Sequence, residues 1–274
     1  MDELAKNLVN LKQAFVSVYN GNSHIQEILP ITRSESFPFD EKDLEMLHEF
    51  AKKNPIYYNS YEQTIGKIPC RVYEGDINEY WLNSISHGAS YQPFYPTWIF
   101  SAYIIALAAK NLGFKEALDI GSGDGRIAYC AKMLDMNSYS FEIDNMLVEL
   151  QHSISASSGI DFNPNCTDAM SFDYSSLHLK KPVFFIGGLA QMGGVSLATG
   201  VLDNFKSCFV FDGTGVVFAG TYSKKYTSDP MSEAGWGTLI HKYGLQVIDI
   251  VVLPTVWTFH ESDDTPYIFS KFIS

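Results

Sequence analysis

Residues 116–126 read Glu-Ala-Leu-Asp-Ile-Gly-Ser-Gly-Asp-Gly-Arg, and this stretch decides the fold. Residues 117–120 predict an apolar strand, the three glycines predict a turn, and the chain from Arg126 onward is typical of a helix. Glycine permits positive φ and lets a ligand approach the backbone closely. The free N–H groups that open a helix favour electron-rich groups. The stretch therefore predicts a site for a nucleotide-like ligand.

Outward from this stretch the chain alternates between strand-like and helix-like segments. Strands are expected at residues 117–121, 138–143, 161–166, 182–187, 214–221, 245–253 and 266–273. Helices are expected near residues 98–112, 124–134, 144–157, 193–206 and 231–243. This alternation predicts a parallel sheet with helices on both faces. The loop 261–265 is too short for a crossover to a parallel strand, so the last two strands should be antiparallel.

The glycine spacing separates two classes of ligand. The dinucleotide fingerprint G-x-G-x-x-G/A needs a small sixth residue so that the helix can pack closely on the strand. Counted from Gly121, the sixth residue is Arg126, which breaks that pattern. The pattern present is Asp-x-Gly-x-Gly-x-Gly, and it starts at Asp119.

Two further acids follow the next two strands. Glu142 ends the second strand, where a carboxylate suits a ribose with free hydroxyls. Asp168 follows the third strand and is placed to accept a hydrogen bond from an adenine amino group. Together with Asp119, these acids favour adenosine with an ammonium-bearing tail and disfavour a pyrophosphate.

This combination resembles the class I S-adenosylmethionine-dependent methyltransferases over roughly residues 95–274. The resemblance implies a seven-stranded, mostly parallel Rossmann-like sheet with an antiparallel last strand, and S-adenosylmethionine as cofactor. Residues 119–127 with 141–144 also resemble, within the class, the archaeal and mitochondrial lysine methyltransferases. The residues expected to bind the cofactor are Asp119, Gly121, Ser122, Gly123, Asp124, Gly125, Glu142, Ile143, Asp168, Ala169, Gly187 and Tyr95.

The chain departs from one group of these enzymes after the fourth strand. Enzymes that methylate base amines or glutamine usually carry Asp/Asn-Pro-Pro-Tyr/Phe there, whereas residues 184–191 read Phe-Phe-Ile-Gly-Gly-Leu-Ala-Gln. Adenine or glutamine N-methylation is therefore not expected. Substrate contacts are expected from Tyr91, Gly188, Gln191 and Tyr222. Tyr95 has two open interpretations, namely contact with the cofactor carboxylate or aromatic packing.

Residues 1–94 predict a mainly helical extension that covers the pocket and selects the substrate. Apolar residues recur every three or four positions in 1–20, and a second helix is expected from Asp40 to before Pro55. Residues 55–95 are rich in tyrosine, and we interpret them as irregular, with one short strand at 67–73.

The composition argues against several classes of binding partner. A net charge of −12 argues against a large nucleic-acid interface, which needs clustered Lys and Arg. The longest apolar run, residues 98–109, is shorter than the roughly 20 residues that span a bilayer. The four cysteines stand apart, so neither a metal site nor a disulfide framework is expected. We expect a cytoplasmic protein.

The sequence thus predicts methyl transfer to a small molecule or a protein side chain. Such a transfer depends mainly on alignment, with a base only if the nucleophile arrives protonated, and no catalytic residue is identifiable. Two alternatives stay open: aminopropyl transfer, as in polyamine synthases, and a non-catalytic cofactor-binding module. Aminopropyl transfer would need acids after the fourth strand, where the chain has Gly187-Gly188-Leu189.

Overall fold

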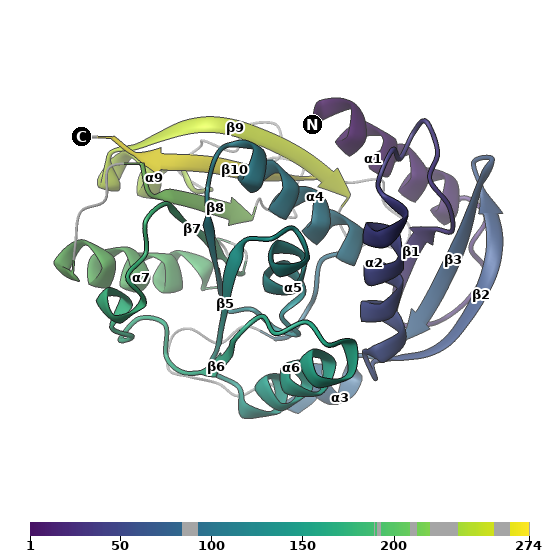
Figure 1. Ribbon diagram of the computed structural model, residues 1–274, viewed down its shortest axis with the longest axis horizontal. Helices are drawn as coiled ribbons and strands as arrows, with labels where there is room; N and C mark the ends of the chain where they lie inside the picture. Colours follow the sequence, from purple (N-terminus) through teal and green to yellow (C-terminus); the bar gives the residue numbers. More distant parts are fainter. Residues whose placement is uncertain are drawn as a thin grey trace.

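A seven-stranded sheet forms the centre of the molecule (Figure 1). The computed structural model describes residues 1–83, 93–188, 190, 193–208, 213–219, 235–254 and 264–273. The strands lie in the order β6-β5-β4-β7-β8-β10-β9. Strands β4 to β8 pair in parallel, whereas β10 runs antiparallel between β8 and β9. The antiparallel last strand expected from the short loop is confirmed.

The strands of this sheet are β4 Glu116–Ile120, β5 Asn137–Glu142, β6 Pro164–Cys166, β7 Pro182–Ile186, β8 Gly215–Ala219, β9 Leu245–Pro254 and β10 Asp264–Phe272. The helices around it are α4 Ile99–Asn111, α5 Arg126–Met133, α6 Asn145–Ser158, η2 Tyr174–Leu177, α7 Gly194–Cys208 and α9 Gly237–Tyr243. The predicted strands and helices of this part are present, but β6 is shorter than expected, and the helix expected near 231–243 is described only from Gly237, where α9 begins.

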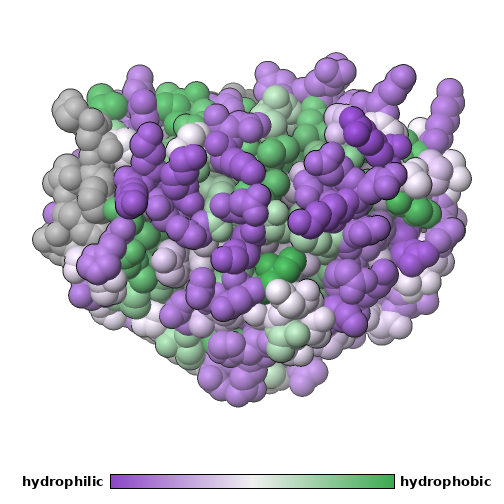
Figure 2. All heavy atoms as spheres, viewed as in Figure 1, coloured by the Kyte–Doolittle hydropathy of each residue, from purple (hydrophilic) through white to green (hydrophobic). Residues whose placement is uncertain are grey.

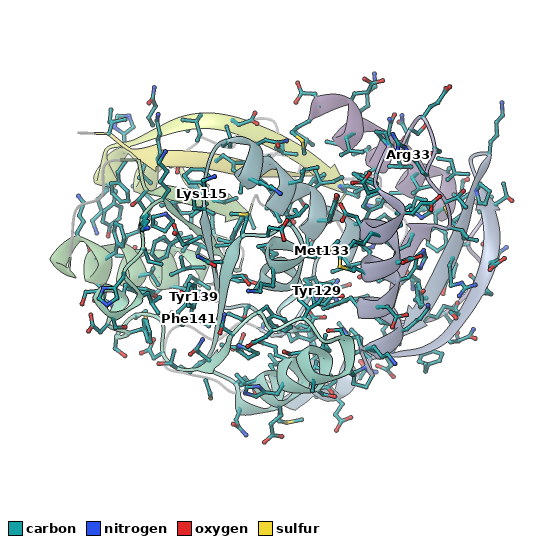
Figure 3. All side chains as sticks on the ribbon, in the orientation of Figure 1. Arg33, Lys115, Tyr129, Met133, Tyr139 and Phe141 are labelled. Carbon is teal, nitrogen blue, oxygen red and sulfur yellow. The ribbon has the colours of Figure 1, made fainter. Side chains whose placement is uncertain are left out.

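Alternate side chains of the strands enter two separate hydrophobic cores. Leu118 and Phe184 pack with α7 and α9 on one face, and Ala117 and Phe185 pack with α4 and α5 on the other. Figure 3 shows the same division around β5, with Phe141 on one side and Tyr129 of α5 on the other. Helices therefore cover both faces of the sheet, as the alternating sequence predicts.

The N-terminal part carries a second, antiparallel sheet of three strands in the order β1-β3-β2. Its elements are α1 Asp2–Val16, β1 Ile25–Pro30, α2 Glu41–Lys53, β2 Tyr57–Ile65, β3 Ile68–Gly75 and α3 Asn78–Asn83. The two expected helices are present. The short strand expected at 67–73 is present as β3, whereas the interpretation of the preceding residues as irregular is wrong for 57–65, which form β2, and β1 is not among the expected strands.

The N-terminal part packs on the α4–α5 side of the main sheet (Figure 1). Helix α2 lies against α5 and α6, and α1 lies along β9. The Tyr129 hydroxyl of α5 donates to the Met46 carbonyl of α2 at 2.8 Å. One hydrophobic core runs through both parts. The N-terminal part is thereby fixed to the helices that support the glycine turn.

The surface seen in Figure 2 is dominated by hydrophilic side chains, with hydrophobic ones scattered among them. Within the described residues, no helix combines the length and apolar character needed to cross a membrane.

Candidate functional site

A cavity of about 580 Å³ lies at the carboxyl ends of the parallel strands. Residues of the glycine turn after β4, the end of β5 and the segment after β6 line one side. Residues from β7, β8, β9 and β10 line the other side. Ligands of open α/β sheets bind in the crevice outside the carboxyl ends of the strands, where the strand order reverses. Here the order reverses between β4 and β7, which both border the cavity.

The glycine turn has a conformation that only glycine adopts without strain. The φ angles of Gly121, Gly123 and Gly125 are +66°, +59° and +77°. Gln151 of α6 holds the turn from behind, since its Nε2 donates to the Gly123 carbonyl at 2.7 Å and to the Ser122 hydroxyl at 3.0 Å. The turn is thus a rigid floor for the cavity.

Glu142 connects the end of β5 to this turn. Its Oε2 accepts the Gly123 N–H at 2.9 Å, and its Oε1 accepts the N–H groups of Ile143 at 2.8 Å and Asp144 at 3.0 Å. A carboxylate has about four acceptor positions, so one on Oε2 remains unused by the described residues, and Glu142 lines the cavity. Burial raises the pKa of Glu142, and these N–H donors partly offset the rise.

Asp119 lies under the turn and is 2% exposed. Its Oδ2 accepts the N–H of Ala128 in α5 at 3.2 Å. Burial raises the pKa of Asp119 well above its usual range, and the charges of Asp124 and Glu142 add to the rise. A cation in the cavity would relieve this concentration of negative charge.

The segment after β6 supplies Asp168 and Ala169 to the cavity wall. The Asp168 Oδ1 accepts the Met170 N–H at 2.9 Å, and within the described residues its Oδ2 has no hydrogen-bond partner. Ile143 also lines the cavity and is 36% exposed although it is a large aliphatic residue. A flat apolar ring could lie against Ile143 and reach the Asp168 carboxylate with its polar edge.

Asp124 and Arg126 form a buried ion pair that extends into the N-terminal sheet. Asp124 accepts from Arg126 Nε at 2.9 Å and Nη2 at 2.6 Å, and from Asn54 at 2.9 Å. Arg126 Nη1 donates to Glu27 of β1 at 2.6 Å. Burial alone would lower the pKa of Arg126, but Asp124, Tyr57 and Glu27 outweigh it and raise that pKa.

The guanidinium of Arg126 has no donor left for a ligand. Its two remaining N–H groups donate to the Thr97 carbonyl and, at 3.3 Å, to the Tyr57 hydroxyl. All five of its donors are therefore used within the protein. Asp124, expected at the cofactor, borders the cavity and also accepts hydrogen bonds from Arg126 and Asn54.

The ends of β4 and β7 approach each other closely beside the turn. The Gly187 N–H donates to the Ile120 carbonyl at 2.6 Å. A Cβ at Gly187 would lie 2.5 Å from the Gly121 carbonyl oxygen, so no larger residue fits without moving the turn. Gly187 and Gly188 both line the cavity at this junction.

A pair of hydroxyl groups marks the far side of the cavity. The Thr97 Oγ1 and the Tyr267 hydroxyl lie 3.0 Å apart, and either can donate. Burial raises the pKa of Tyr267, partly offset by Thr97 and by the charge of Arg126. Tyr95 lines the cavity two residues before Thr97 and packs edge-on against Trp81.

The structure brings most of the expected site residues to this one cavity. Asp119, Gly121, Ser122, Gly123, Asp124, Glu142, Ile143, Asp168, Ala169, Gly187, Gly188 and Tyr95 line it. Gly125 does not line it. Gly125 precedes α5 as its N-cap, where a Cβ would lie 2.4 Å from the Phe162 ring. Tyr91, Gln191 and Tyr222 lie outside the described residues.

Sequence reasoning missed the structural partners of the turn. Arg126 was recognised only as a break in the dinucleotide pattern, and Glu27 was not singled out. Arg126 and Glu27 lie 99 positions apart in the chain, so no local sequence pattern predicts their contact. Tyr267 was also missed, because an aromatic residue in an apolar strand is ordinarily a core residue.

The arrangement of the main sheet fits the resemblance found in the sequence. A mostly parallel sheet of seven strands, with an antiparallel strand at its end and a glycine turn after β4, is what that resemblance implies. The fold is the class I methyltransferase fold.

No protein-family model and no curated protein matches the sequence. Similar solved structures include MtNAS in complex with S-adenosylmethionine, with 16% identity, 65% of this chain and 64% of that chain covered, and a TM-score of 0.44. TrmN from Thermus thermophilus matches with 13% identity, 78% and 59% coverage, and a TM-score of 0.46. A ribosomal protein L11 methylase from Lactobacillus delbrueckii subsp. bulgaricus matches with 13% identity, 66% and 81% coverage, and a TM-score of 0.45. The chain thus covers less than two thirds of the first two structures.

Proposed function

We propose that this protein is an S-adenosylmethionine-dependent methyltransferase. The observation that carries the proposal is the set of three acids, Asp119, Glu142 and Asp168, around one cavity whose floor is the glycine turn. Asp119 lies next to the last residue of β4, Glu142 ends β5 and Asp168 follows β6, so the three acids line the cavity along three neighbouring strands.

The residues present fit the parts of this cofactor one by one. The remaining acceptor position on Glu142 Oε2 suits a ribose hydroxyl. Asp168 Oδ2 suits the adenine amino group, with Ile143 against the ring. The concentrated negative charge at Asp119 suits the ammonium and sulfonium groups. A cavity of this size lies in the range of about 300–1,000 Å³ typical of small-molecule sites.

The chain's own contribution to methyl transfer is alignment and exclusion of water. When bound, the cofactor supplies a methyl group on a sulfonium sulfur, and the acceptor's lone pair takes the methyl carbon while the carbon–sulfur electrons return to sulfur. The close approach of Gly187 to Gly121 keeps the wall beside the turn free of side chains, so backbone borders the place of transfer. Residues 93–97, which precede α4, supply further wall, and we propose that the N-terminal part helps to select the substrate.

A dinucleotide suits this site poorly. Its pyrophosphate would face Asp119 and Glu142, and Arg126 has no free donor to offset that repulsion. Aminopropyl transfer, the first alternative, is not favoured by any described residue after β7, where Gly187 and Gly188 carry no acid. A non-catalytic module would bind the same cofactor, and only turnover separates it from an enzyme.

Isothermal titration calorimetry tests the proposal. We expect S-adenosylmethionine and S-adenosylhomocysteine to bind with micromolar-scale affinity and NAD not to bind. Tight binding of NAD, or failure of both adenosyl ligands to bind a folded protein, would overturn the assignment.

A further inference from the structure

The cavity divides into two halves of different charge. One part, which we call the acidic half, is lined by Asp119, residues 121–124 and 141–144, Leu147 and residues 167–170. The other part, which we call the neutral half, is lined by residues of β7, β8, β9 and β10 and of the turn after β7, together with Thr97, Ile105 and Leu197. The strand order places β4, β5 and β6 on one side of the sheet centre and β7 to β9 on the other. The two halves therefore lie on opposite sides of the cavity and meet where β4 pairs with β7.

Among the described residues that line the cavity, every carboxylate belongs to the acidic half. These are Asp119, Asp124, Glu142, Asp144 and Asp168. The described lining of the neutral half is uncharged and mainly apolar, and its larger apolar members include Ile105, Phe185, Ile186 and Leu197. The cofactor's cationic groups are matched by the acidic half, so the neutral half is left for the molecule that receives the methyl group.

Charged acceptors find no partner among these neutral-half residues. A lysine ammonium or a polyamine would need a carboxylate beside it, because burial of an unpaired ion costs far more than burial of a paired one. A phosphate or carboxylate would need a cation. Arg126, the cation that borders the cavity among described residues, has all five donors engaged by the protein.

The neutral half does offer a hydrogen bond. Thr97 Oγ1 and the Tyr267 hydroxyl lie 3.0 Å apart. One of the two hydroxyl groups donates its proton to the other, so the proton of the second hydroxyl is left to donate to a ligand. The raised pKa of the Tyr267 phenol keeps it protonated at neutral pH. Tyr267 pairs across the sheet with Ala219 at the end of β8, so both residues border the same part of the cavity.

We propose that the methyl acceptor is a small uncharged molecule with an apolar body and one hydroxyl-type group, bound in the neutral half. This inference rests on the proposed methyltransferase function. For a hydroxyl acceptor, an oxygen lone pair forms the new bond to the methyl carbon, the carbon–sulfur bond breaks with its electrons going to sulfur, and the hydroxyl proton leaves to solvent. Ether and thioether are both neutral products.

Three phenols of similar size test the charge preference. 4-Ethylphenol is neutral, tyramine is cationic and 4-hydroxyphenylacetate is anionic, while all three present the same phenol. Each is titrated into the full chain saturated with S-adenosylhomocysteine, and methylation is followed with tritiated S-adenosylmethionine. We expect 4-ethylphenol to bind and the two ions to bind roughly a hundredfold more weakly, as an unpaired charge in a buried site requires. Equal or tighter binding of either ion, or binding of none of the three, overturns the inference.

A matched pair of variants at Ala219 sharpens the test. Ala219→Asp adds a carboxylate to the neutral half and should turn the preference toward tyramine, whereas Ala219→Asn adds the same shape without charge and should not. An unchanged preference in a folded Ala219→Asp protein would place the acceptor elsewhere.

A Tyr267→Phe variant tests the hydroxyl pair. It should raise the KM for 4-ethylphenol while leaving the affinity for S-adenosylhomocysteine unchanged. If that affinity falls instead, the pair holds the cofactor tail and its assignment to the acceptor is wrong. Failure of S-adenosylhomocysteine to bind the parent protein would count against the methyltransferase function itself, so the two failures are distinguishable.

Discussion

The acidic and neutral halves of the cavity are built on strands of the same sheet, yet the charge of their lining side chains differs. In the acidic half, burial raises the pKa values of Asp119 and Glu142, and the charges of neighbouring carboxylates add to the rise, so negative charge is unfavourable at these two residues in the free protein. In the neutral half, the described side chains are packed without charge. This difference is the basis of our proposal that the acidic half binds the cofactor's cationic groups and that the neutral half binds an uncharged acceptor.

Arg126 donates to Asp124 of the acidic half and to the Thr97 carbonyl of the neutral half, and its removal should have the largest effect. Arg126→Ala leaves Glu27 and Asp124 as buried, unpaired carboxylates, both 0% exposed. Breaking a buried pair in this way costs about 3–5 kcal/mol of unfolding free energy. Urea denaturation followed by circular dichroism measures the loss.

The matched control is Arg71→Ala, which breaks the exposed pair of Arg71 with Glu62. Exposed pairs contribute about 0–1 kcal/mol, so this variant should stay close to the parent protein. A similar small loss for both variants would show that the buried ion pairs of Arg126 contribute no more to stability than an exposed pair.

Glu142 tests the acidic half itself. Glu142→Ala should weaken binding of S-adenosylhomocysteine by about 1–3 kcal/mol, the range for a lost charge-assisted hydrogen bond in a buried site. Calorimetry measures the change, and Glu149→Ala, an exposed acid on α6, serves as the control. Unchanged affinity in Glu142→Ala would place the ribose elsewhere.

The same residue predicts a pH dependence. Because burial raises the pKa of Glu142, its carboxylate takes up a proton at a pH above the ordinary glutamate value. Ligand affinity should therefore fall as the pH falls through that raised pKa, since a ribose hydroxyl donates best to the ionised form. Glu142→Gln should remove this dependence. Persistence of the dependence in Glu142→Gln would assign it to another group.

A substitution at Asp119 should have a smaller effect on stability than Arg126→Ala, and it should stabilise the protein. A raised pKa means that ionised Asp119 destabilises the folded state as the pH rises through it. Asp119→Asn should therefore add about 1 kcal/mol of unfolding free energy at neutral pH, and the gain should vanish below the ordinary aspartate pKa. Thermal unfolding at the two pH values measures it.

The same substitution should weaken binding of the cofactor. Asp119→Asn should weaken binding of S-adenosylmethionine more than that of S-adenosylhomocysteine, because only the former carries the sulfonium charge. Equal weakening of both ligands would show that Asp119 does not face the sulfonium.

The main sheet was predictable because its signals are local. Glycines at 121, 123 and 125 follow an apolar strand, and all three adopt the positive φ that only glycine tolerates well. The short connection before β10 excluded a crossover, and β10 is antiparallel. The acids at the ends of β5 and β6 followed from the same strand positions.

The N-terminal sheet gave no such signals. Every residue of β1 is buried, so the alternation that identifies a half-buried strand is absent. Strand β2 contains strand-favouring Tyr, Thr and Ile, but eight of its nine residues are exposed or only partly buried, so it lacks the alternation of buried and exposed apolar residues that identifies a half-buried strand. The role of Glu27 depends on a contact with Arg126, 99 positions away, which only tertiary structure brings about.

The most direct test of the account is a crystal structure of the protein with S-adenosylhomocysteine. We expect the ribose hydroxyls at the Glu142 carboxylate, the adenine between Ile143 and Asp168, and the sulfur beside Gly187 facing the neutral half. Adenosine bound in the neutral half, or a ribose away from Glu142, would contradict the account.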